Sequence, residues 1–214
     1  RGLFHELGHN ALLKNPEMAG KFLDEYSGFL TKRIGKLDKE IPQNFKNIAE
    51  DLFVLADERG PAKSIYNNAV ARFKKLTPAE KKQTLRALNL EMFKDSQRRI
   101  GSTRAGGDVR NMLKSLKRDQ DYIMWQQTAE TIRRDLGVKS RRRTYQANFE
   151  ETFAELFEKT TLGTLGSRTD PDFVFQSKNF PETAKNLTKL VQKEITPLIK
   201  EALFRLGDYR YLLL

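Results

Sequence analysis

Apolar residues recur every three to four positions through almost the whole chain, and this period constrains the fold more than any other feature of the sequence. A helix brings residues at that spacing onto one face, which can then be buried against a neighbouring element. Between residues 16 and 37, for example, one helical face would carry Met18, Phe22, Tyr26, Phe29, Leu30 and Ile34. No segment alternates convincingly as a β-strand does, and the short VFQ at 174–176 is the best candidate. The sequence therefore predicts a mainly α-helical fold.

Prolines, glycines and capping residues indicate where these helices begin and end. Asn15 is suited to cap a helix that has Pro16 at its first position, and Thr77 and Glu80 form the two ends of a capping box. Gly137 is suited to end a long helix. The expected helices are 2–14, 16–37, 43–59, 62–75, 78–99, 108–136, 146–161 and 181–206, the last with Pro197 inside it.

Two glycine-containing segments between the expected helices are predicted to be loops. They are GSTRAGGD at 101–108 and TLGTLGSRTDPD at 161–172. The glycines of the first suggest a phosphate-binding loop, but such a loop ends in Gly-Lys-Ser or Gly-Lys-Thr, and that ending is absent. We therefore expect no phosphate site there.

The chain is strongly basic, with 39 Lys and Arg against 28 Asp and Glu and a net charge of +11. Such a charge favours an anionic partner such as nucleic acid. A role in solubility alone is equally consistent, because the charges are spread out and no nucleic-acid-binding motif is present. The residues most suited to phosphate contact lie in the densest basic clusters and are Arg133, Arg134, Arg141, Arg142 and Arg143.

The composition also excludes several kinds of protein. The chain has no cysteine, which rules out disulfides and thiolate metal sites. The mean hydropathy is −0.64, and no apolar run approaches the roughly 18–20 residues that a membrane-spanning helix needs, so we expect no membrane partner. No signal peptide is visible, and the first residue is Arg1. We expect a piece of a larger parent chain, and the sequence indicates no compartment.

The segment HELGH at 5–9 holds both histidines of the chain. On a helix, His5 and His9 lie one turn apart on the same face, so both imidazoles can reach one metal ion, for which Zn²⁺ is the natural choice. Glu6 would flank such an ion without binding it, and from there it could take a proton from a metal-bound water. This is the H-E-x-x-H pattern typical of zinc metallopeptidases.

A catalytic zinc site needs a third protein ligand, which has to be a carboxylate here because no histidine or cysteine remains. Glu151 and Glu155 share one face of the expected helix in NFEETFAELFEK at 148–159. Glu151 could bind the metal, and Glu155 could accept the free N–H of a liganding histidine. Glu50, on an earlier expected helix, is an alternative third ligand. The helix at 148–159 could also simply expose its glutamates to water.

The segments HELGH and EETFAELF together resemble the gluzincin branch of the zincin metallopeptidases. The tyrosine ahead of the second segment makes the chain look most like the lethal-factor-like group, and related zincin-like domains occur inside very large phage and mobile-element proteins. The resemblance implies zinc as cofactor, a polypeptide as substrate and Glu6 as the catalytic base. Its implied ligands are His5, His9 and Glu151, with Glu155 orienting a ligand histidine and Tyr145 stabilising the oxyanion.

The resemblance covers only residues 2–14 and 144–160, and it has two departures. Glu151 follows His9 at a longer separation than we expect for this group, and the β-sheet that precedes the motif helix in zincins is missing from the sequence. The expected fold is therefore the helical portion of a zincin. Residues 1–60 would hold the motif helix and the helices after it, 61–140 a helical insertion, and 141–214 the third-ligand helix and the C-terminal helix.

Three functions follow from these features. The first is a zinc-dependent peptidase domain of a larger protein, such as a phage virion protein or a toxin. The second is a catalytically inactive structural or interaction module of a large assembly, whose basic face contacts nucleic acid. The third is a fold in which zinc has only a structural role and links helices that are far apart in the sequence.

Overall fold

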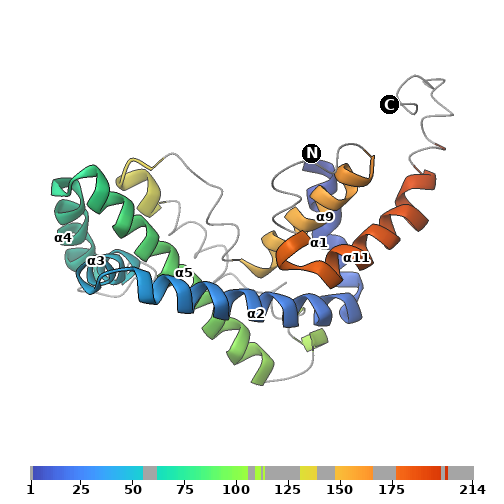
Figure 1. Cartoon of the computed structure of the whole chain (residues 1–214), viewed down its shortest axis with the longest axis horizontal. Coiled ribbons are helices and arrows are strands. Elements are labelled where there is room, and N and C mark those ends of the chain that lie inside the picture. Colours follow the sequence, from blue (N-terminus) through green and yellow to red (C-terminus); the bar gives the residue numbers. More distant parts are fainter. Residues whose placement is uncertain are drawn as a thin grey trace. The chain divides into compact units, whose positions relative to one another are not determined.

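The computed structural model describes residues 2–54, 62–105, 109–111, 113, 131–138, 148–165, 177–198 and 201 (Figure 1). Nearly all of this part is helical and it contains no strand, which confirms the mainly α-helical fold. Within the same part, no helix combines the length and the apolar character needed to cross a membrane. Tyr145, Arg141–Arg143 and the segment 174–176 lie outside the described residues.

The helices follow one another in the order expected from the sequence. Their bounds are α1 Gly2–Lys14, α2 Pro16–Glu40, α3 Gln43–Phe53, α4 Ala62–Lys75, α5 Pro78–Ala105, α9 Phe149–Leu165 and α11 Pro181–Leu190, with a π-helical turn at Val191–Ile195. The π turn comes directly before the helical residues around Pro197, where the missing proline N–H disturbs regular α-helical bonding.

The predicted helix caps are confirmed. The backbone N–H of Met18 donates to the side-chain oxygen of Asn15 over 3.0 Å at the start of α2. At the start of α5, the backbone N–H of Thr77 donates to the Glu80 carboxylate over 2.8 Å, and the N–H of Glu80 donates to the Thr77 hydroxyl over 3.4 Å. Gly137 ends the helical residues 131–135 with a φ of 70°, a conformation that glycine adopts without strain.

The two predicted loops were wrong where the structure describes them. Helix α5 continues through Gly101 to Ala105, and α9 continues through Gly163 to Leu165. A glycine inside a helix costs about 1 kcal/mol, which packing readily offsets once the helix has formed. In α9 that packing is evident, because Thr160 and Thr161 are fully buried and the Thr161 hydroxyl donates to the carbonyl of Phe157.

The chain divides into two compact units that interleave in sequence. One unit takes residues 1–26 and 149–214, and the other takes residues 27–148. The first unit therefore combines both ends of the chain, and the predicted insertion at 61–140 falls within the second unit.

Aromatic side chains form the core of the first unit. The ring of Phe22 lies 4.9 Å from that of Phe149, 5.2 Å from that of Phe153 and 5.2 Å from that of Phe180, measured between centroids. All four rings are buried, and Tyr26 extends the cluster. Burying each such side chain contributes about 1.5–3 kcal/mol. This cluster joins α2 to α9 and so anchors the helix that carries the candidate third ligand.

The second unit has its own core, built mainly from α3, α4 and α5. Its buried members are Ile41, Ile48, Ala49, Leu52, Tyr66, Ala69, Ala87, Leu88, Leu90 and Ile132. The hydroxyl of Tyr66 donates to Asp135 over 2.8 Å, and burial together with this carboxylate raises the pKa of the tyrosine well above its usual range.

The N-terminus of α11 is capped by a side chain from another helix, and this arrangement carries a prediction. The Glu25 carboxylate accepts the backbone N–H groups of Glu182 and Thr183 over 2.9 and 3.0 Å, and it also accepts the Thr183 hydroxyl. Glu25→Gln replaces one accepting oxygen by a donor, so we expect it to lower the free energy of unfolding by about 1–2 kcal/mol in a urea titration. Glu17→Gln is the matched control, since this exposed carboxylate pairs only with Lys21 among the described residues. Equal midpoints for the two variants would contradict the capping role.

Candidate metal centre

Helix α1 packs along α9, and a glycine allows the two backbones to approach closely. A Cβ atom built on Gly8 would lie 2.7 Å from the Cα of Ala154 and 3.1 Å from the Ala154 carbonyl oxygen. Both residues are buried. The contact brings the face of α1 that bears His5 and His9 next to the N-terminal half of α9.

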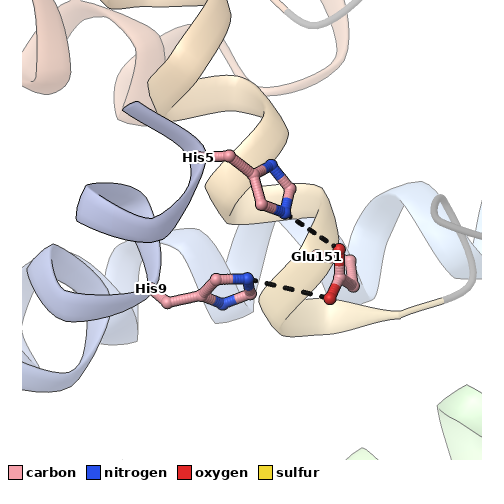
Figure 2. Close-up of side chains that lie close together, drawn as sticks. All are labelled: His5, His9 and Glu151. Atoms are coloured by element: carbon pink, nitrogen blue, oxygen red, sulfur yellow. Dashed lines mark hydrogen bonds and ion pairs between the residues drawn. The ribbon is translucent and has the colours of Figure 1, made fainter. Parts of the chain in front are cut away.

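The Glu151 carboxylate lies beside the two histidine rings and faces both of them (Figure 2). Its Oε2 atom is 3.1 Å from Nε2 of His5, and its Oε1 atom is 3.7 Å from Nε2 of His9. The two rings stand edge to face with centroids 5.0 Å apart. One ligand atom from each of the three residues falls within a common span of 4.8 Å. Both Nε2 atoms and the carboxylate are therefore directed at one small region.

The site is partly withdrawn from water, which affects the protonation of His9. The side chains of both histidines are 22% exposed, and that of Glu151 is 12% exposed. Burial lowers the pKa of His9 below its ordinary value of 6.5, and the nearby charges of Glu151 and Glu6 oppose this shift while His5 adds to it. A lowered pKa favours neutral imidazole at pH 7, which is the form that binds a metal.

The three residues could together hold a metal ion, and zinc is one ion whose usual ligands they match. Two imidazole nitrogens and one carboxylate oxygen are ligands that zinc accepts, and three protein ligands leave one of four positions open, as catalytic zinc sites require. Around a tetrahedral zinc with ligands at about 2.0–2.1 Å, neighbouring ligand atoms are roughly 3.3 Å apart. The three ligand atoms lie within 4.8 Å of one another, which is wider than that separation, so the side chains would have to move closer together to bind one ion.

The other residues predicted for this site have different positions. Glu6 lies on the exposed side of α1 beside His5, near enough for its charge to influence His9. Glu155 lies one turn after Glu151 on α9, and its predicted contact with a ligand histidine stays a prediction. Glu50 is exposed on α3 in the other unit, and the group that could hold a metal ion among the described residues includes Glu151 and not Glu50.

A carboxylate that the sequence reasoning did not select lies against the far side of the His5 ring. Oε2 of Glu158 is 3.6 Å from Nδ1 of His5, and the side chain of Glu158 is 12% exposed. Glu151 and Glu158 are seven residues apart, which places them on one face of α9, two turns from each other. The seven-residue spacing from Glu151 to Glu158 is visible in the sequence. Glu155, four residues after Glu151, lies on the same helix face, and the sequence alone does not distinguish the two.

The predicted basic clusters are only partly within the described structure. Arg134 is exposed and pairs with Asp135 over 3.4 Å, and Arg133 is partly buried on the same turn. On α5, Arg98 and Arg99 both pair with Asp95. Ion pairs of this kind are usual on a solvated helix surface. Contact of the basic clusters with nucleic acid stays a prediction.

In comparisons with known proteins, no family model, curated protein or solved structure matches the chain.

Proposed function

We propose that the chain carries the metal-binding and catalytic part of a zinc-dependent peptidase of the gluzincin type, acting on a polypeptide and belonging to a larger parent protein. The observation that carries the proposal is the convergence of His5, His9 and Glu151 from two helices that are far apart in the sequence. Three such ligands around an open position form the donor set of a catalytic zinc site.

In this proposal His5, Glu6 and His9 of the HELGH segment each have a defined task. His5 and His9 present Nε2, and Glu151 presents a carboxylate oxygen to the same region. Zinc bound there would supply Lewis-acid activation of a water molecule and of the peptide carbonyl. Glu6 is exposed beside the ligands, so its carboxylate is open to solvent and can accept the proton of an attacking water.

The test is the Glu6→Gln variant, which keeps the size of the side chain and removes the base. We expect its zinc content to equal that of the unaltered chain and its cleavage of a quenched-fluorescent peptide library to fall by about 10²–10⁴-fold. Glu17→Gln, an exposed glutamate on α2, is the matched control and should leave cleavage unchanged. Equal cleavage by the Glu6→Gln variant would show that Glu6 is not the base.

A purely structural metal site is the second candidate, and one observation favours it. The three ligands join α1 to α9, so an ion there would link segments far apart in the chain and stabilise their packing. This candidate predicts that zinc raises the melting temperature while no peptide is cleaved. The library assay on the zinc-loaded chain therefore separates the two functions.

A further inference from the structure

The ring of His5 lies between two carboxylates of α9, each facing a different nitrogen. Glu151 is 3.1 Å from Nε2, and Glu158 is 3.6 Å from Nδ1. Rotating the ring by half a turn would exchange each nitrogen with a carbon and lose both contacts. The pair of carboxylates therefore selects one ring orientation, in which Nε2 points at Glu151 and at the side facing His9.

The two carboxylates also influence which nitrogen of the His5 ring carries the proton. Neutral imidazole carries one N–H, and without a metal both carboxylates compete for it, Glu151 at 3.1 Å and Glu158 at 3.6 Å. An ion bound at Nε2 would exclude the proton from that nitrogen, and Glu158 would then accept it at Nδ1. A proton on Nδ1 leaves the lone pair of Nε2 free for a metal. The 3.6 Å separation from Glu158 is an ion-pair distance slightly longer than a hydrogen bond, and the rotatable glutamate side chain can close it.

We propose that Glu158 is the positioning residue for His5, holding its ring and its Nδ1 proton so that Nε2 is presented to the metal. This inference rests on the metal site of the proposed function but not on peptide cleavage. It gives Glu158 a part of the same kind as the one that the sequence pattern predicts for Glu155. The reason is geometric, because the contact with Nδ1 measured in the structure comes from two turns after Glu151.

The test uses zinc-loaded protein and the fact that the chain has only two histidines, which makes their ring resonances simple to assign. Long-range proton–nitrogen NMR correlation identifies the nitrogen of His5 that binds zinc and the one that carries the proton. We expect Nε2 to bind zinc and a slowly exchanging proton on Nδ1. In Glu158→Ala this proton should exchange rapidly, and zinc affinity should fall by about 10–100-fold.

Two further variants separate a positioning role from a general loss of packing. Glu158→Gln keeps an acceptor oxygen and should restore most of the proton protection and the affinity, and it serves as the primary comparison if Glu158→Ala does not fold. Glu155→Ala, on the same face of α9, is the direct comparison, and we expect it to lower zinc affinity less than Glu158→Ala does.

Several results would overturn the proposal. They are an unchanged His5 spectrum and affinity in Glu158→Ala, a larger effect of Glu155→Ala, or zinc bound through Nδ1 of His5. Absence of zinc binding at the histidines would overturn both this proposal and the metal site. If zinc binds, Glu158 behaves as expected and no peptide is cleaved, the positioning role stands and the peptidase fails.

Discussion

Glu151→Ala is expected to abolish zinc binding at micromolar concentration and any cleavage that depends on it. The carboxylate is the member of the group that contacts both histidines, so its removal leaves two imidazoles without a third donor. Structural zinc sites contribute about 10–16 kcal/mol through four ligands, so one ligand corresponds to roughly 3 kcal/mol, or more than 100-fold in affinity. Competition with a chromophoric chelator measures the affinity directly.

Glu50→Ala is the control for this variant because it removes the rival carboxylate, which is exposed on α3. We expect its zinc affinity to match that of the unaltered chain. Circular dichroism should show that Glu151→Ala remains helical, since the buried aromatic residues of its unit are untouched. A loss of zinc in Glu50→Ala with binding retained in Glu151→Ala would reverse the assignment of the third ligand.

Much of the helical fold could be predicted because local rules decide where helices begin. Asn15 and the pair Thr77 and Glu80 act on backbone groups within three residues of themselves, so a short window of sequence contains the whole interaction. Helix ends were predicted less well. Gly101 and Gly163 are locally unfavourable in a helix, but α5 and α9 pass through them. In α9 the cost is small compared with the packing of the buried Thr160 and Thr161.

The candidate ligands could be selected from the sequence for a chemical reason. Only two histidines were available, they share one helix face, and the absence of cysteine left a carboxylate as the third donor. Glu158 could not be selected in the same way. Glu151, Glu155 and Glu158 all lie on one face of α9, and which of them meets Nδ1 of His5 depends on how far α1 is shifted along α9.

The position of α1 along α9 depends on the close contact at Gly8, and the Gly8→Val variant tests this dependence. In Gly8→Val, the added side chain would overlap the backbone of Ala154, because even a Cβ atom would lie 2.7 Å from its Cα. Helix backbone cannot yield as a flexible side chain does, so α1 has to move away from α9. We expect a loss of about 1–3 kcal/mol in the free energy of unfolding, or more, and loss of detectable zinc binding. Urea titration and chelator competition measure the two effects.

Gly8→Ala and Gly28→Ala form a matched pair that separates the contact from helix propensity. Both replace a helical glycine, and alanine alone should stabilise a helix by about 0.5–1 kcal/mol. At Gly28, a Cβ atom would meet nothing within 4 Å, so this gain should appear in full. At Gly8, the contact with Ala154 should make the alanine substitution destabilising instead of stabilising. Zinc binding should also weaken, since moving α1 separates His5 and His9 from Glu151. If Gly8→Ala is as stable as Gly28→Ala and binds zinc equally well, the two helices do not need this close approach to form the site.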